Sequence, residues 1–191
     1  PVKTEMGRDI RKVFVADENC KLVDADYSQV ELRVLAHMSG DENMIDAFKH
    51  GEDIHSKTAS QIFDVDIKDV TSKQRIEAKA INFGIIYGKT DFGLSQDLNI
   101  PVATAKAYID SYFNKYPKIK EFMDEAVESA TETGYATTIL NRRRYIPEIK
   151  ASNFIVRNQG KRFAMNAPIQ GSAADIIKVA MVNVYNKLKE N

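Results

Sequence analysis

Four side chains at four-residue spacing could hold a nucleoside triphosphate. Arg75, Lys79, Phe83 and Tyr87 would form one slowly turning stripe on a helix, because residues i and i+4 share a helical face. Arginine offers a planar fork of donors to phosphate oxygens and lysine a compact charge, while the two rings can hold a sugar and a base. The spacing alone leaves open a plainer interpretation, in which a solvated Arg/Lys face runs into an aromatic core edge.

A carboxylate that follows an apolar run is the second candidate feature. Residues 20–23 (Cys-Lys-Leu-Val) predict a buried strand, and Asp26 comes shortly after its end. There, Asp26 and the backbone carbonyl of Tyr27 could bind a hard divalent ion that keeps waters and phosphate oxygens as its other ligands. By itself the Asp-Ala-Asp sequence is weak evidence, because aspartates at strand ends commonly cap helices or form turns.

Read together, these stretches resemble family A DNA polymerases. Each motif is long and ordered, and the resemblance covers nearly the whole chain. It implies template-directed DNA synthesis from deoxynucleoside triphosphates (dNTPs), with primer-template DNA as the partner. The matching segments are Gly7-Arg8-x-Ile10-Arg11-x-x-Phe14, Asp26-Tyr-Ser-Gln-Val-Glu31, Asp53-Ile54-His55, Arg75-x-x-x-Lys79-x-x-x-Phe83-Gly-x-x-Tyr87-Gly and Asn166-Ala-Pro-Ile-Gln170-Gly.

The resemblance implies a role for each matched residue around the triphosphate. Asp26 would bind two Mg²⁺ ions, and the carbonyl of Tyr27 would bind one of them. His55, Arg75 and Lys79 would contact the triphosphate and neutralise the charge that grows on the leaving pyrophosphate. Lys79 would also donate a proton to that leaving group. The alternative for His55 is a capping or core histidine.

The same resemblance assigns the sugar and base contacts. Phe83 and Tyr87 would flank the incoming sugar and the templating base, and Phe83 would disfavour nucleotides that lack a 3′-hydroxyl. Glu31 would collide with a 2′-hydroxyl and so select deoxyribonucleotides. Ser28 and Gln29 complete the predicted dNTP-binding set.

A polar stripe near the end of the chain is the first candidate for contacting DNA. Arg162, Asn166 and Gln170 are four residues apart and share a helical face unless Pro168 breaks the turn, in a helix expected to begin near Asn166. They match family positions that donate to minor-groove acceptors near the primer terminus. These acceptors are nearly the same in every base pair, so an enzyme can check pair shape without reading sequence. Polar capping around Pro168 is the alternative.

A basic turn is the second candidate for contacting DNA. Residues 134–140 and 145–149 predict the two strands of a β-hairpin, with Asn141 in the left-handed turn conformation. Arg142 and Arg143 are candidate contacts to the phosphate backbone. For either arginine the alternative is an exposed basic turn residue, because neighbours on a strand point to opposite faces.

The overall pattern predicts a helix-rich α+β fold. By resemblance, residues 1–33 and 135–191 would form part of a polymerase palm (a strand, the β-hairpin and a helix), with residues 34–134 inserted as a helical fingers subdomain. No internal repeat or Gly/Ser linker separates these parts. Helix starts are predicted at Asp53, Thr71 and Pro101, a helix stop at Gly40, and buried tyrosines at Tyr108, Tyr112 and Tyr116.

One departure from the family pattern bears on activity. Family members carry a His-Asp-Glu motif after the helix that contains Asn166, and this sequence reaches Asn191 without it. Two-metal phosphoryl transfer needs carboxylates on both sides of the ion pair. We therefore expect this chain to be an internal piece of a polymerase, inactive by itself, with part of its palm core exposed where the remaining palm and thumb segments would pack.

The composition is that of a globular protein and does not identify a function. Its 191 residues are 43% hydrophobic and carry a formal net charge of zero. Acidic residues outnumber basic ones in residues 1–70, and basic residues prevail over 71–191, where triphosphate and duplex would bind. No apolar run approaches the roughly 20 residues that cross a bilayer. The lone Cys20 indicates a reducing compartment, the bacterial cytoplasm, and a role in strand packing.

Three other functions compete with DNA synthesis by this chain. The first is a non-catalytic nucleotide- or DNA-binding module. The second is a nucleotide-sugar transferase with Asp24 and Asp26 as its metal motif, chemistry that does not require the Arg75–Tyr87 stripe. The third is a single-subunit RNA polymerase, against which Glu31 and the Asn82-Phe83-Gly84 context argue.

Overall fold

The computed structural model describes residues 4–190, which are mainly helical. This confirms the helix-rich prediction. The helices and strands are α1 (Glu5–Arg11), α2 (Val30–Ser39), α3 (Glu42–Lys49), α4 (Ile54–Phe63), α5 (Ser72–Ile86), α6 (Asp91–Leu98), α7 (Val102–Lys115), α8 (Pro117–Thr133), β1 (Tyr135–Thr137), β2 (Arg143–Tyr145) and α9 (Phe154–Lys189). Short 3₁₀ turns cover Ile67–Asp69 (η1) and Pro147–Lys150 (η2).

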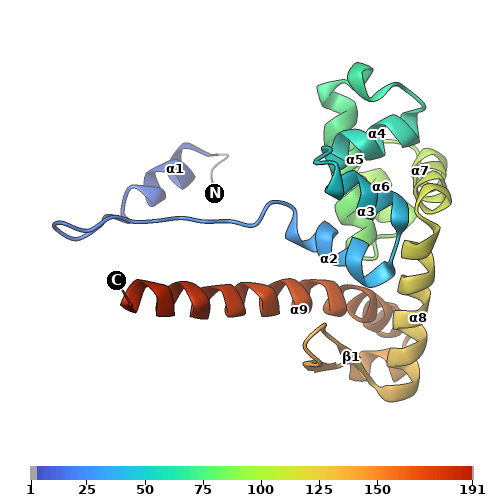
Figure 1. Cartoon of the computed structure of the whole chain (residues 1–191). Helices are drawn as coiled ribbons and strands as arrows, with labels where there is room; N and C mark the ends of the chain where they lie inside the picture. The colour runs from blue at the N-terminus through green and yellow to red at the C-terminus, as the bar shows by residue number, and fades with distance from the viewer. Residues whose placement is uncertain (1–3, 191) are drawn as a thin grey trace.

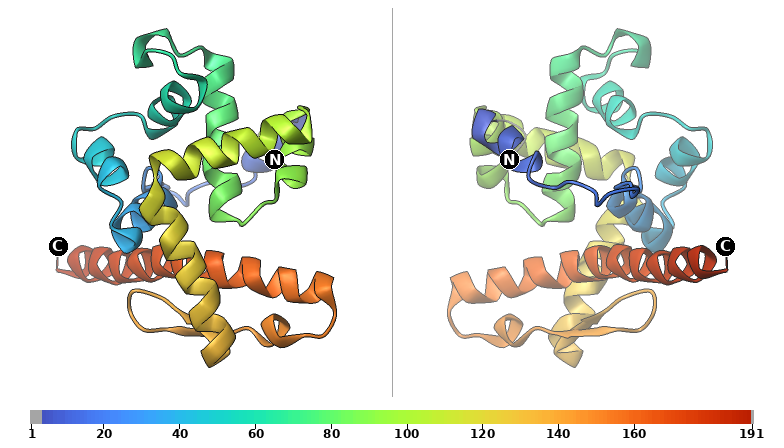
Figure 2. Two further views of the ribbon diagram at one scale, coloured as in Figure 1. Left: turned by 90° about the vertical axis from the view of Figure 1, so that its right-hand side faces the viewer. Right: turned by 90° about the vertical axis from the view of Figure 1, so that its left-hand side faces the viewer.

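The helices gather on two sides of the long helix α9. Helices α3 to α7 form one group, while α8 crosses α9 and the β1–β2 hairpin lies against the N-terminal half of α9 (Figures 1 and 2). Helix α1 lies apart from this body, on the side of the C-terminal half of α9, and the irregular residues 12–29 lead from it to α2 (Figure 1). Within the described residues, no helix is long and apolar enough to cross a membrane.

Local capping signals begin and end the helices where the sequence predicts. The Asp53 side chain accepts from the His55 amide at the start of α4. Thr71 caps α5 in a reciprocal capping box with Gln74. Gly40 ends α2 in the left-handed conformation, at φ 66°, which glycine adopts without the steric penalty of a Cβ atom.

The main core lies among the helices that surround α5. Tyr112 and Tyr116 are both fully buried, as predicted, and their ring centroids are 4.9 Å apart. They belong to a cluster that also contains Leu35 of α2 and Ile81 of α5. Tyr108, also predicted to be buried, is only partly buried and packs against the same core. Burial of these large side chains fixes α5 relative to α2 and α7, and therefore fixes the position of the α5 stripe.

The hairpin forms where predicted, with shorter strands. Tyr135 pairs with Tyr145 in antiparallel register, and Asn141 takes the left-handed conformation at φ 62°. Residues 138–142 form the connecting turn, in which the Thr138 amide donates to the Arg142 carbonyl at 3.0 Å. The turn therefore holds the arginines beside α9.

The last helix is longer than predicted. It begins at Phe154, not near Asn166, because the Asn153 side chain accepts from two amides and caps it there. It also continues through Pro168, so the possible break at this proline does not occur. Pro168 and Ile169 are buried, and their packing offsets the backbone hydrogen bond that proline cannot make.

The strand predicted over residues 20–23 is absent, and so is the packing role predicted for Cys20. Leu22 and Val23 are 67% and 89% exposed, and Cys20 is exposed as well. A strand needs a neighbour to accept its hydrogen bonds, and β1 and β2 pair only with each other in the described chain. The apolar side chains of Leu22 and Val23 are therefore exposed to solvent.

Candidate functional site

Helix α5 presents the two predicted cations to solvent. Arg75 and Lys79 are exposed, one turn apart, whereas Ala78 and Ile81 of the same helix are fully buried. Arg75 is held by a bidentate ion pair, in which its Nε lies 2.5 Å from Oδ2 of Asp53 and its Nη2 lies 3.2 Å from Oδ1. Lys79 has no ion pair within residues 4–190, and its amine lies 6.0 Å from the Phe83 ring centroid. Lys79 is therefore the cation that is free to meet an anion.

Asp53 is an unexpected member of the site. Burial opposes ionisation of its carboxyl group, but hydrogen bonds from Arg75 and Ser56 and the positive charge of Arg75 outweigh this effect and lower its pKa to about 2. Asp53 also caps α4. One carboxylate therefore joins α4 to α5 and fixes the direction of the Arg75 guanidinium.

The Asp53–Arg75 pair predicts a loss of stability in acid. Because the pKa of Asp53 is lowered to about 2 from 3.8, the pair stabilises the fold above pH 3.8, and the contribution disappears as the pH falls towards 2. The pair is partly exposed, so we expect about 1 kcal/mol. Unfolding free energies of wild type and Asp53→Asn should differ by this amount at pH 7 and converge near pH 2.

A suitable control for this measurement is Asp69→Asn. Asp69 is exposed and its carboxylate has no ion pair within the described chain. Its substitution should leave the unfolding free energy nearly unchanged across the same pH range. A constant difference between wild type and Asp53→Asn from pH 2 to pH 7 would show that the cap, and not the charge, accounts for the contribution of Asp53.

His55 is buried and hydrogen-bonded, so its tautomer is fixed. Its side chain is 3% exposed, and its Nδ1 lies 3.1 Å from Nδ2 of Asn82, which also lies 3.2 Å from Oγ1 of Thr58. An amide nitrogen only donates, so Nδ1 accepts and the proton of the neutral ring lies on Nε2. Burial lowers the pKa of His55, and Arg75 and Lys79 lower it further against the opposing charge of Asp53. The sequence did not indicate this role for Asn82.

Removing Asn82 should disturb His55. In Asn82→Leu the buried Nδ1 loses its donor, so we expect the free energy of unfolding to fall by about 2 kcal/mol. Imidazole ¹⁵N chemical shifts should also show a mixture of His55 tautomers in place of one. Thr58→Val serves as the control, because it removes a partner of Asn82 without touching His55, and it should keep the single tautomer. An unchanged tautomer in Asn82→Leu would contradict this role.

The aromatic half of the stripe lies beside the predicted metal-binding segment. Phe83 and Tyr87 stack with their centroids 6.2 Å apart, and the Tyr87 hydroxyl donates to Glu31 at 3.3 Å. Burial, and after it the charge of Glu31, raises the pKa of Tyr87. A cavity of about 220 Å³ under Phe83 is lined by Asp26, Tyr27, Gln29, Val30, Glu31, Leu32 and Phe83. The fold thus brings together residues that the sequence separates by more than fifty positions.

A second cavity adjoins Tyr87 on the other side. It has a volume of about 410 Å³ and is lined by Tyr87, Gln159, Arg162, Phe163, Asn166 and Gln170. Asn166 also donates to the Ile86 carbonyl at 3.2 Å, which joins α9 to the end of α5. Gln159 and Phe163 are not among the residues predicted from the sequence, because they precede the helix start expected near Asn166. Their spacing from Arg162 and Asn166 would have shown them on the same face of a longer helix.

The hairpin arginines have protein partners. Arg142 Nε lies 2.8 Å from Asp175 Oδ1, and its Nη2 donates to the Gly171 carbonyl at 3.0 Å. Hydrogen bonds from Thr138 and then from Arg142 lower the pKa of Asp175, against the effect of burial. The guanidinium of Arg143 lies 4.6 Å from the Tyr135 ring centroid. Arg142 thus joins the hairpin to α9 next to Gln170. Ser28, on the extended segment, is exposed, and its carbonyl accepts from Arg33.

Comparison with known proteins decides the family. The model of the family described as DNA polymerase family A matches residues 1–191. The chain belongs to DNA polymerase family A. It is 54% identical over 191 residues to DNA polymerase I of Caldicellulosiruptor bescii and 53% identical over 191 residues to that of Geobacillus stearothermophilus. Both alignments cover 100% of this chain and 22% of the relative, so the chain spans about a fifth of these family A polymerases.

A solved polymerase structure has the same fold. The chain is similar to the POL domain of Pol1 from M. smegmatis in complex with DNA primer-template and dNTP, with a TM-score of 0.91 and 45% sequence identity. The match covers 100% of this chain and 34% of that one. At this identity and TM-score, α5, the hairpin and α9 adopt the arrangement of a polymerase domain.

The residues present fit only part of a metal site. Family A polymerases are generally dependent on divalent metals. Asp26 and the Tyr27 carbonyl are hard oxygen ligands on an exposed segment. Within residues 4–190, no group of three or more His, Cys, Asp or Glu side chains lies close enough to hold a metal ion. The described residues therefore do not form a complete two-metal site.

Proposed function

We propose that this chain is the dNTP-binding portion of a DNA-directed DNA polymerase, which transfers nucleotides to a primer 3′-hydroxyl in DNA replication and repair. One observation carries the proposal. Tyr87, at the end of the α5 stripe, lines the cavity that also contains Arg162, Asn166 and Gln170. Its hydroxyl donates to Glu31, which lines the cavity that contains Asp26. A dNTP on α5 would thus lie between the metal-binding segment and the face of α9 that would contact primer-template DNA.

We infer a role for each residue from the family resemblance, and its position supports that role. Lys79 binds the triphosphate, and Arg75 adds the guanidinium nitrogen that is not paired with Asp53. The Nε2–H of neutral His55 also donates to the triphosphate. Lys79 protonates the leaving pyrophosphate. Phe83 and Tyr87 hold the sugar and base, while Glu31, whose carboxylate accepts from Tyr87, excludes the 2′-hydroxyl of a ribonucleotide. Gln29 lines the cavity that contains Asp26, and Ser28 would complete the dNTP-binding set.

We infer that the intact enzyme requires two Mg²⁺ ions. Asp26 and the Tyr27 carbonyl would supply part of the ligand set, and further carboxylates must come from other segments of the polymerase. When bound, the ions would activate the attacking oxygen and steady the leaving group. We infer that the palm comprises residues 1–33 and 135–191 and the fingers residues 34–134. We also infer that the parent enzyme works in the bacterial cytoplasm, at the nucleoid.

Contacts to DNA divide between two regions. Arg162, Asn166 and Gln170 would donate to the minor groove near the primer terminus. Arg143 is the better candidate of the hairpin arginines for a phosphate contact, because Arg142 is already paired with Asp175. Arg142 would act by holding the hairpin against α9.

Magnesium-dependent primer extension tests the proposal. The complete polymerase that contains this sequence should extend a primer with dNTPs. The 191-residue chain alone should bind dNTP but extend no primer, because the described residues lack a complete metal site. A parent protein that binds nucleotide or DNA without extension would instead support the alternative, a non-catalytic binding module.

Substituting Phe83 tests the assignment of the sugar site. In the complete polymerase, Phe83→Tyr should increase dideoxynucleotide incorporation about tenfold or more, because the added hydroxyl supplies a hydrogen bond in place of the missing 3′-hydroxyl. Phe92→Tyr is the matched control, since Phe92 is exposed on the next helix, α6. Unchanged chain termination in Phe83→Tyr would remove Phe83 from the sugar site.

A further inference from the structure

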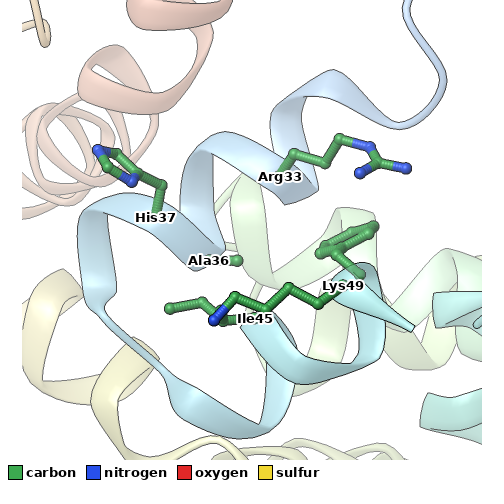
Figure 3. A pocket seen from close by; sticks show the side chains of 6 residues that line it. Arg33, Ala36, His37, Ile45 and Lys49 are labelled. Carbon is green, nitrogen blue, oxygen red and sulfur yellow. The ribbon is translucent and has the colours of Figure 1, made fainter. Parts of the chain in front are cut away.

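A basic hollow lies between α2 and α3, outside the sites proposed above. Figure 3 shows the side chains around it. Its volume is about 370 Å³. The residues that line it are Arg33, Ala36, His37, Ile45, Phe48 and Lys49. None of them lines the cavities beside Tyr87 and Phe83. The hollow is therefore separate from both of these cavities.

The hollow faces away from the dNTP cleft. Arg33 and His37 are one turn apart on α2, and Glu31, which reaches Tyr87, precedes Arg33 by two residues. Two residues correspond to a rotation of about 200° around a helix. A ligand in the hollow and a dNTP on α5 would thus contact opposite faces of α2.

The floor of the hollow is apolar and firmly packed. Ala36 is 2% exposed, and Ile45 and Phe48 pack against the main core. The guanidinium of Arg33 lies 4.6 Å from the Phe48 ring centroid, and its Nε donates to the Ser28 carbonyl at 3.0 Å. These two contacts orient the guanidinium plane, while its terminal nitrogens have no hydrogen bond to the described residues.

The rim of the hollow carries positive charge without a matching acid. Within residues 4–190, Lys49 and His37 make no side-chain hydrogen bond and no ion pair, and Arg33 makes no ion pair. The Lys49 side chain extends across the hollow towards Ile45, and Arg33 and His37 project from α2 on either side of Ala36 (Figure 3). Cations gathered over an apolar floor raise the local concentration of anions.

We propose that this hollow binds one or two nucleotides of single-stranded DNA. Arg33 and Lys49 contact backbone phosphates, His37 donates a further hydrogen bond, and a base stacks on the Arg33 guanidinium, which itself rests on Phe48. Planar bases stack on aromatic and guanidinium faces with little regard to sequence, and cations follow the backbone. A stacked base distinguishes this ligand from a simple anion.

The test follows an NMR signal inside the hollow. The isotope-labelled 191-residue chain is titrated with an oligothymidylate of about four nucleotides, and the Ile45 methyl groups report binding. The titration uses an Arg75→Gln/Lys79→Gln/Arg162→Gln background, which weakens the sites beside Tyr87. We expect saturable Ile45 shifts there, so the result is independent of whether α5 binds dNTP.

Two single substitutions on the rim then test the phosphate contacts. Arg33→Gln and Lys49→Gln should each raise the Kd measured at Ile45 by about five-fold or more and reduce the salt-dependence slope by about 0.7. Lys106→Gln is the matched control, because Lys106 is exposed on α7 and pairs with Asp110; it should change neither quantity. Both rim side chains are exposed, and circular dichroism checks that each variant keeps its helices.

Two results would overturn the proposal. Absence of Ile45 shifts, or equal affinity in wild type and both rim variants, would show that no site exists in the hollow. Inorganic phosphate that shifts Ile45 with the same affinity as the oligonucleotide would show that the base contributes nothing and that the hollow is not a nucleic-acid site.

Discussion

Gly160→Ala should destabilise the fold more than any other glycine-to-alanine change on α9. A Cβ atom at this position would lie 2.5 Å from the Ile149 backbone nitrogen and 2.7 Å from the Glu148 carbonyl carbon. Both obstacles are backbone atoms of η2, which cannot move aside like the end of a flexible side chain. We expect the free energy of unfolding to fall by about 3 kcal/mol, seen in denaturant unfolding and as a Tm lower by about 10 °C.

The matched control is Gly93→Ala on α6. The nearest atom to a Cβ there is Thr90 Oγ1, at 3.6 Å, an ordinary contact. Alanine favours a helix over glycine by about 1 kcal/mol, so this variant should be as stable as wild type or more so. Equal stabilities for Gly160→Ala and wild type would mean that α9 and η2 are not packed as closely as described.

Lys79→Ala should reduce primer extension by the complete polymerase about 100-fold or more. Lys79 projects from α5 without an acidic partner in the described chain, so its charge is available to the triphosphate and its proton to the leaving group. Steady-state primer extension with saturating DNA measures the effect. The largest loss should appear in kcat if proton donation dominates, and in KM if Lys79 only binds the dNTP.

Lys73→Ala is the control for this second prediction. Lys73 lies on the same helix, six residues earlier, and is 87% exposed beside Glu77. Its removal changes the net charge of α5 by the same amount without touching the stripe, so activity should remain close to that of wild type. Equal activity of Lys79→Ala and Lys73→Ala would exclude Lys79 from the reaction.

Elements set by nearby residues were predictable from the sequence. Thr71 and Gln74 form the capping box that begins α5, and Asn141 adopts the left-handed turn conformation of the hairpin. Both depend on side chains within a few positions. The four-residue spacing of the α5 stripe likewise needs only helical geometry, so Phe83 and Tyr87 stack as neighbours.

The start of α9 and the members of the second cavity were harder to predict. The sequence predicts a helix start near Asn166 and a possible break at Pro168, whereas Asn153 caps the helix and Phe154 is its first residue. Burial on η2 and on the hairpin stabilises the helix on both sides of the proline. Because that burial comes from other segments, the sequence of the helix alone did not reveal it.

By itself, then, the sequence determined the family motifs, the helix caps and the α5 stripe, because each depends on contacts between residues close in the chain. Only the tertiary structure decided that Asp53 pairs with Arg75 and that Asn82 fixes the tautomer of His55. In the tertiary structure, residues 20–23 also have no strand partner within the described chain. A strand needs a neighbour, and an ion pair or a buried hydrogen bond needs a partner that the fold brings from another helix.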